Sequence, residues 1–292
     1  MGKMMNTKKL FLGLLPMMAS ILFGIGPEAM TFPLDIRSMA LSGTGAAGGC
    51  STDVNPAMIN DLPKISGIEF TRHTWYADIS GMNIRYRHLR KIPIIVDLTN
   101  WNSGDIGQWG EVPQDDPIGT ISLHWVSAGL TTGFMKNGWN IGIGLKGHFG
   151  RMVIESVKGV TLDAGILRPI TPNLRIGVAM KNLGSFSSTE LDITSPVNLS
   201  AGIQLNESFT GVNILADVVQ EKSHGTYFRA GLEKSFKNII LMSGATLSPD
   251  KFQYSLGTAY SIGQWKFGYG VAFHQNDILG TPQSFTISKK LN

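Results

Sequence analysis

Apolar and polar residues alternate with a period of two along most of the chain after about residue 66. In WNIGIGLKGHF (139–149) most odd positions hold large apolar residues, whereas the even positions hold Asn, Gly, Lys or His. The segments 252–262 and 265–274 repeat the alternation, with aromatic residues on one face. Successive side chains of a strand point to opposite faces, so this pattern predicts strands of a sheet with two unlike faces.

Turn signals separate these segments into a series of short units. Examples are DISG (78–81), KNG (136–138) and SPD (248–250). Counting the units between residues 66 and 291 predicts about fourteen strands. Most connections are short, which predicts antiparallel hairpins; the longer connections are 101–117 and 184–196. No change in composition divides the region, so residues 65–292 are expected to form one domain.

Two all-β architectures fit this pattern, and they differ in which face points inward. A soluble sandwich or barrel would bury the aromatic face, whereas a membrane barrel turns it toward lipid. The strands are about ten residues long, as a tilted spanning strand requires. The less apolar face consists largely of Gly and small polar residues, which suits a narrow lumen. We therefore expect an antiparallel transmembrane β-barrel in the outer membrane of a Gram-negative bacterium, with outer-membrane lipid around it.

The six tryptophans support the same expectation through their positions along the chain. They fall mostly near the ends of the predicted strands, where interfacial aromatic girdles occur in membrane barrels. Packing in a core is the alternative explanation. The residues are Trp75, Trp101, Trp109, Trp125, Trp139 and Trp265.

The N-terminal residues 1–29 have the order of an export signal. A short basic segment precedes the apolar run LFLGLLPMMASILFGIG, and small residues follow it. A membrane anchor is the alternative, although the run is shorter than a spanning helix needs. We expect 1–29 to be a signal peptide.

Charge and cysteine content exclude several classes of function. The formal net charge is +4, and the three lysines and one glutamate of residues 1–29 account for half of it. Nothing in this balance indicates a nucleic-acid partner. A single cysteine, Cys50, excludes an internal disulfide framework and a metal site made of several cysteines.

The stretch ALSGTGAAGGC (40–50) contains a GxGxxG motif at Gly43, Gly45 and Gly48. A dinucleotide fingerprint needs a strand before the motif and a helix after it within a βαβ unit, and this context is missing. Cys50 also lies too far beyond the apolar run for a lipid-attachment site. The glycines instead predict a turn-rich segment with positive φ angles and close backbone packing.

No constellation of residues in the sequence indicates catalysis, a cofactor or a bound metal. The six histidines are scattered without ligand-like spacing, and no nucleophile motif is present. Asp115 and Asp116 precede a proline in the long connection and have the character of turn residues. We therefore expect a protein that is not an enzyme and that has no cofactor.

The stretch 40–50 belongs to a longer segment that resembles a known family. The run Arg37-Ser-Met-Ala-Leu-Ser-Gly-Thr-Gly, followed by Asp53 and then Asn55-Pro56-Ala57, is similar to the N-terminal signature of the PorV/PorQ family and the wider FadL-like outer-membrane barrels. The segments 162–185, 195–205, 227–236 and 267–291 also resemble strands of that family. The signature residues are Arg37, Gly43, Gly45, Asp53, Asn55 and Pro56.

The resemblance implies a fourteen-stranded barrel whose segment 30–64 folds inward as a plug. PorV/PorQ-like members bind secreted cargo or partner proteins in type IX secretion, and the compact length favours this role; the partners would be secretion components or C-terminal signal domains of cargo. The alternative is a FadL-like channel for hydrophobic small molecules. A contact surface for the partner is expected in the 101–117 connection, at Trp101, Trp109, Asp115 and Asp116.

Three features depart from the family pattern. Ser42 stands before Gly43 where the family has a second glycine, and the family's acidic pair is reduced to Asp53. The C-terminus lacks a final aromatic residue, so Phe285 and Leu291 would have to serve in barrel assembly.

Overall fold

The computed structural model describes residues 25–49, 51–89, 91–109, 115–152, 155–189, 192–248, 251–274 and 280–291. These residues contain four short helical segments: η1 (Pro27–Thr31), α2 (Ile36–Ala40), η2 (Pro56–Asn60) and η3 (Tyr76–Asp78). The strands are β1 (Gly67–Thr74), β2 (Ser80–Leu89), β3 (Pro93–Asn102), β4 (Ile106–Gln108), β5 (Gly119–Ile121), β6 (His124–Lys136), β7 (Trp139–Met152), β8 (Glu155–Pro169), β9 (Leu174–Ser187), β10 (Asn198–Glu207), β11 (Val212–Glu221), β12 (Gly225–Phe236), β13 (Ile239–Ser248), β14 (Lys251–Ile262), β15 (Trp265–His274) and β16 (Gln283–Lys290).

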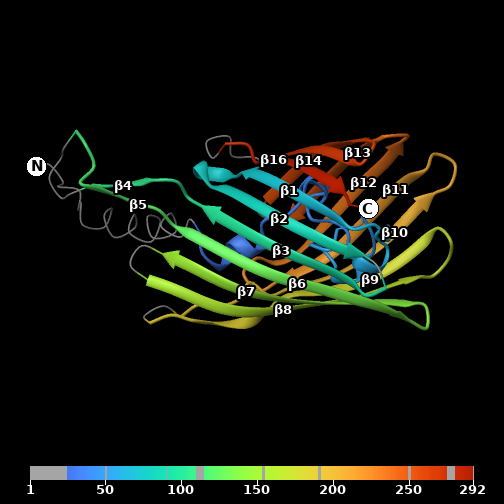
Figure 1. The fold of residues 1–292 in the computed structure, drawn as a ribbon, viewed down its shortest axis with the longest axis horizontal. Helices are drawn as coiled ribbons and strands as arrows, with labels where there is room; N and C mark the ends of the chain where they lie inside the picture. The colour runs from blue at the N-terminus through green and yellow to red at the C-terminus, as the bar shows by residue number, and fades with distance from the viewer. Residues whose placement is uncertain are drawn as a thin grey trace, which may run out of the picture.

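Fourteen of these strands form a closed antiparallel barrel, as the alternation predicted (Figure 1). Each strand pairs with its neighbours along the chain, except that β3 pairs directly with β6, and β1 pairs with β16 to close the cylinder. Closure removes the two unpaired outer strands that an open sheet would expose to lipid. No helix among the described residues is long and apolar enough to cross a membrane.

The apolar face of the sheet points outward, as expected for a barrel surrounded by lipid. In β1 every second residue is buried, and the exposed positions include Ile68 and Phe70. In β14 and β15, Phe252, Tyr254 and Phe267 are likewise exposed. The buried face carries small and polar residues such as Thr71 and Ser255. This arrangement confirms the predicted orientation of the two faces.

The two ends of the barrel differ in their connections. At the turn end, where β1 begins and β16 ends, the connections include the two-residue turns 137–138, 237–238 and 263–264. The loop end carries the longer connections after β3, β9 and β15. In outer-membrane barrels short turns face the periplasm and long loops face the exterior, so the loop end is the external end.

The connection after β3 contains a second, small sheet. Strands β4 and β5 pair antiparallel, and this hairpin extends beyond the barrel at the loop end (Figure 1). The strands β6 to β9 have 13 to 15 residues, longer than the ten or so that the sequence predicted.

The prediction of an interfacial girdle is wrong for Trp101 and Trp125. Both side chains are only 1% exposed and lie on the inner face of the wall. Trp265 is exposed, and Trp139 is half-buried, both at the turn end. Both residues do lie near strand ends, as predicted, but alternation places their side chains on the face of the strand that points into the lumen.

Candidate functional site

Residues 25–49 and 51–62, here called the luminal segment, lie inside the barrel. The helix α2 contacts β13 to β16, whereas η2 contacts β3 and β6 to β8 on another part of the wall. Asp35 begins α2 by accepting a hydrogen bond from the Ser38 amide at 2.8 Å. Pro56 at the start of η2 loses no helical hydrogen bond because the first amides of a helix have no internal acceptor. The segment thus spans the lumen in short helical pieces joined by turns.

At the loop end, the luminal segment contributes to an aromatic group that we call the mouth cluster. Its main members are Ile25, Met30, Phe32, Trp101, Trp125 and Phe186. The ring of Phe32 lies 4.8 Å from that of Trp75 and 4.9 Å from that of Trp101. The indole Nε1 atoms of Trp101 and Trp125 are buried without a hydrogen-bond partner. Apolar rings therefore lie at the external end of the lumen, and two of their N–H groups make no hydrogen bond.

Glycines on neighbouring strands make room for the three wall aromatics of this cluster. Trp101 pairs across the sheet with Gly81, and a Cβ added there would lie 2.4 Å from the indole ring. The pairs Trp125–Gly150 and Phe186–Gly159 repeat the arrangement, at 2.5 and 2.1 Å. Each ring therefore lies over a glycine of the neighbouring strand, where a larger residue would collide with it.

The middle of the lumen is charged and closely packed around Arg85 of β2. Its guanidinium lies 2.9 Å from Asp35 of the luminal segment, 2.5 Å from Asp97 of β3 and 3.5 Å from Glu69 of β1. All four side chains are buried. A buried charge is tolerated only when it is paired, and here one guanidinium joins three carboxylates. Arg85 therefore links the luminal segment to three strands.

Asp53 makes a second ionic attachment between the luminal segment and the wall. Its carboxylate accepts a hydrogen bond from the Leu34 amide at 3.0 Å and lies 3.3 Å from Lys181 of β9. Burial alone would raise the pKa of Asp53, but the charges of Lys181 and Lys146 and this amide hold it well below its usual value. Asp53 is therefore ionised at neutral pH, and the segment is held electrostatically.

The space left beside α2 is small. A cavity of about 60 Å³ is bounded by charged residues that include Arg37, Glu69, Arg87 and Lys266. A cavity of roughly 150 Å³ is needed to hold benzene, whereas one water takes about 30 Å³. This cavity can therefore hold water but not an aromatic hydrocarbon.

The other signature residues each have a defined partner. Arg37 donates a hydrogen bond to Glu233 of β12 at 2.7 Å. The Gly43 carbonyl accepts from Arg229 at 3.1 Å, and the Gly45 amide donates to Asp217 at 2.7 Å. Both glycines have positive φ, as predicted. These contacts place the first half of the signature against β11 and β12.

Asn55 and Pro56 form the second half of the signature. The Asn55 side chain donates to the Ala46 carbonyl at 2.5 Å and accepts from the Ala57 amide at 2.9 Å. A Cβ at Gly142 of β7 would lie 2.2 Å from the carbonyl carbon of Pro56. Asn55 thus joins two turns of the luminal segment through hydrogen bonds, and Pro56 packs directly on the backbone of β7.

The predicted partner-contact residues do not form one surface. Trp101 is buried in the mouth cluster, so its prediction as a contact residue is wrong. Trp109 is 60% exposed beside β4, and Asp115 and Asp116 are exposed before β5. Residue 101 belongs to the end of β3 and not to the loop, because the strand continues to Asn102.

Two further predictions fall wholly or partly outside the described residues. Cys50 lies outside them, as do residues 1–24 of the predicted signal peptide. Ile25 and Ala29 are described and are buried in the mouth cluster. A boundary at residue 29 would therefore remove two buried side chains from this cluster.

The barrel wall has an irregularity next to the mouth cluster. Pairing between β8 and β9 shifts register between Leu162 and Ala164, and Asn182 adopts a φ of 59° there. Beyond Lys181, β9 continues to Ser187 paired with β8 alone, because β10 begins opposite Lys181. Residues 182–187 thus form a free strand edge, which we call the wall break.

The connection to β10 covers the wall break through a few polar contacts. The Ser195 hydroxyl donates to the Asn182 carbonyl, and the Asn182 amide group donates to the Pro196 carbonyl at 3.4 Å. Phe186 of the wall break and Ile193 of the connection both pack on the mouth cluster. The wall break and the connection that covers it therefore each place an apolar side chain against the mouth cluster.

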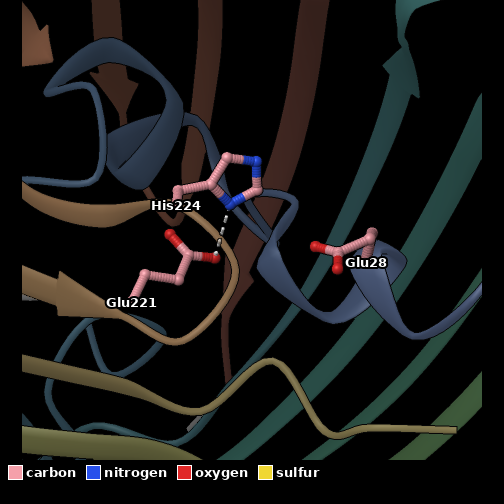
Figure 2. Close-up of side chains that lie close together, drawn as sticks. All are labelled: Glu28, Glu221 and His224. Atoms are coloured by element: carbon pink, nitrogen blue, oxygen red, sulfur yellow. Dashed lines mark ion pairs between the residues drawn. The ribbon is translucent and has the colours of Figure 1, made fainter. Parts of the chain in front are cut away.

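One group of ligand-type side chains was not foreseen from the sequence. Glu28 of η1, Glu221 at the end of β11 and His224 in the following turn lie at the loop end with ligand atoms within 4.8 Å of one another (Figure 2). Almost two hundred positions separate Glu28 from the other two residues. Spacing along the chain therefore carried no signal for this group.

Comparisons with known proteins show the fold. No family model matches the chain, and no curated protein does. Among solved structures, the toluene transporter TodX of Pseudomonas putida matches with a TM-score of 0.68 and 11% identity over 88% of this chain and 100% of that chain. The monoaromatic hydrocarbon channel CymD matches with a TM-score of 0.62 and 10% identity over 89% and 98%. The chain has the fold of these outer-membrane β-barrels, and nothing in these matches favours the PorV/PorQ family specifically.

Proposed function

We propose that the protein admits hydrophobic small molecules through the outer membrane and releases them sideways through the wall break. The observation that carries this proposal is the contact between the aromatic mouth cluster and the free edge of β9 at Phe186. An apolar solute entering at the loop end would meet the mouth cluster first, and then residues 192–197 of the connection between β9 and β10.

The charged middle of the lumen supports a sideways route and opposes a straight one. Arg85 and its three carboxylates form a layer that an apolar solute would have to cross, at the cost of separating buried ion pairs. The cavity beside α2 is also too small for such a solute. The wall break bypasses this layer because it lies at the level of the mouth cluster.

The likeness to solved structures favours the same class of substrate. TodX is named a toluene transporter and CymD a monoaromatic hydrocarbon channel. For this chain we propose monoaromatic hydrocarbons and apolar molecules of similar size, since the mouth cluster consists of apolar and aromatic side chains.

Uptake of an apolar probe by intact cells tests the proposal. Gram-negative cells with a complete lipopolysaccharide layer would be compared with and without the protein, using a naphthylamine dye whose fluorescence rises in lipid. We expect faster dye entry in cells that make the folded barrel. Equal rates, with the barrel shown by heat-dependent gel migration to be folded in the outer membrane, would reject a channel role.

A second candidate function rests on the exposed β4–β5 hairpin. Ile106, Trp109 and Ile118 are each at least 45% exposed, and Asp115 and Asp116 lie beside them. Exposed aromatic and apolar side chains are typical of protein contacts, so the hairpin is where secreted cargo would bind if the chain acts in type IX secretion. Capture of a cargo C-terminal signal domain by the whole barrel, lost when residues 103–122 are replaced by a short glycine–serine turn, would favour this function over the channel.

A further inference from the structure

The group Glu28, Glu221 and His224 joins two parts of the molecule that are otherwise far apart in sequence. Glu28 lies on η1, at the start of the luminal segment, whereas Glu221 and His224 flank the turn between β11 and β12 (Figure 2). Figure 2 shows the Glu28 carboxylate facing the imidazole of His224 and the carboxylate of Glu221. A ligand held by all three would fasten the luminal segment to the external rim of the barrel.

The spacing of the donor atoms is close to that of a metal centre. Nδ1 of His224 lies 3.6 Å from Oε1 of Glu221, and all three ligand atoms lie within 4.8 Å of one another. Ligands at about 2.1 Å from a tetrahedral Zn²⁺ are separated by about 3.4 Å from each other. One pair therefore already has the required separation, and rotation of the exposed Glu28 side chain would bring in the third donor.

Glu221 is held from outside the group in the way that ligating carboxylates are. It is 5% exposed, and its Oε2 accepts a hydrogen bond from the Tyr227 hydroxyl at 2.7 Å. Arg229 in turn donates to the same hydroxyl at 2.8 Å and lies over the Tyr227 ring. Oε2 is thereby fixed, and Oε1 is left facing His224. Such outer hydrogen bonds orient metal ligands and are a regular part of metal sites.

The kinds of ligand atom in this group indicate which metal ion it would bind. One imidazole nitrogen with two carboxylates suits first-row transition metals, whereas Ca²⁺ and Mg²⁺ prefer sites made entirely of oxygen. His224 is 42% exposed, so an ion can reach the site from outside the cell. Binding would displace the Ser223 hydroxyl, which now lies 2.9 Å from Nδ1 of His224.

We propose that the export signal is cleaved before Ile25, which leaves the buried Ile25 and Ala29 in the mature chain. We further propose that Glu28, Glu221 and His224 of that chain bind one divalent transition-metal ion, with Zn²⁺ as the best fit, and that this ion fastens η1 to the β11–β12 turn. The role is structural: the ion adds a link between the luminal segment and the wall at the mouth, where the segment has apolar contacts to the mouth cluster.

Calorimetric titration of the whole, untagged barrel in detergent with ZnCl₂ tests the site. We expect one Zn²⁺ per chain, an affinity at least tenfold higher than for CaCl₂, and a higher thermal unfolding midpoint with Zn²⁺ than with EDTA. His224→Ala and Glu28→Gln should each lower the Zn²⁺ affinity at least tenfold. His88→Ala on β2 and Glu207→Gln at the turn end are the matched controls and should keep it.

Three results would overturn the proposal. Absence of saturable Zn²⁺ binding by the folded barrel would remove the site altogether. Equal affinity in the wild type and His224→Ala would place the bound ion elsewhere. Loss of binding in His224→Ala but full binding in Glu28→Gln would reject the link to the luminal segment. Glu28→Gln changes an exposed side chain, so a failure to fold is not expected to obscure this last result.

Discussion

At the scale of single residues, glycine determines how closely the luminal segment approaches the wall. Gly142 of β7 lies against the backbone of Pro56 and Ala57, and an added Cβ would stand 2.2–2.3 Å from those backbone atoms. Backbone cannot move aside as the end of a flexible side chain can. Gly147, five residues further along the same strand, has no other heavy atom within 4 Å of an added Cβ.

We therefore expect Gly142→Ala to destabilise the protein by about 1–3 kcal/mol, because η2 must move away from the wall. Gly147→Ala is the matched control and should leave the free energy of unfolding nearly unchanged. Unfolding in guanidinium chloride from lipid vesicles measures both. Equal stabilities of the two variants would mean that η2 does not rest on β7.

Arg85 pairs with three buried carboxylates of the lumen. Replacing it with methionine keeps an unbranched apolar stem but removes the guanidinium, which leaves Asp35, Asp97 and Glu69 without their common partner. We expect a loss of about 3–5 kcal/mol in the free energy of unfolding, as found when one member of a buried ion pair is removed.

Arg168→Met provides the comparison for Arg85→Met. Arg168 is exposed near the turn end and lies over the ring of Trp139, so its loss should cost less than about 1 kcal/mol. Similar losses in the two variants would show that the three carboxylates do not depend on Arg85.

At the scale of elements, the end of β9 is the part of the wall with the least support. Its residues beyond Lys181 have a strand partner on one side only, whereas shorter strands such as β1 are paired along their whole length on both sides. The bulge at Asp163 and the positive φ of Asn182 separate this end from the regular part of the strand. Bulges of this kind bend strands and end their pairing.

Phe186→Ala tests whether this end of β9 borders the route of the solute. Phe186 lies between the mouth cluster and the wall break, so removing its ring should raise dye uptake several-fold in the cell assay. Phe228→Ala on β12 removes an outward-facing ring away from the wall break and should leave uptake unchanged. If neither variant alters uptake although both fold, the route does not pass Phe186.

At the scale of the whole molecule, ion pairs hold the luminal segment inside the barrel. The pKa of Asp53 lies below that of a free aspartate, so its ion pair contributes stability above about pH 4. That contribution is lost only as the pH falls through the lowered pKa. The attachment is therefore expected to be constant from about pH 5 to pH 8 and to weaken below about pH 4.

Comparison of the wild type with Asp53→Asn measures this pH dependence. The wild type should be the more stable protein at pH 7, and the difference between the two free energies of unfolding should shrink as the pH is lowered toward 3. A difference that stays constant between pH 3 and pH 8 would contradict the assignment of Asp53 as an ionised attachment point.

The sequence by itself determined the barrel, its approximate number of strands and the direction of its apolar face. The number of strands follows from local alternation and turn residues. The direction of the apolar face was inferred from the strand length and from the small and polar residues of the other face. The expectation that residues 30–64 form a plug came from the family resemblance, and the six signature residues lie in the luminal segment of the structure.

Only the tertiary structure decided which charges meet, where the wall is interrupted, and that Glu28 lies beside Glu221 and His224. Arg85, Asp35 and Lys181 look like ordinary polar positions in the sequence, because their partners lie on other strands or in another segment. The burial of Trp101 and Trp125 also depended on register, which places a glycine opposite each ring. Contacts across the lumen join residues distant in sequence, so no local pattern predicts them.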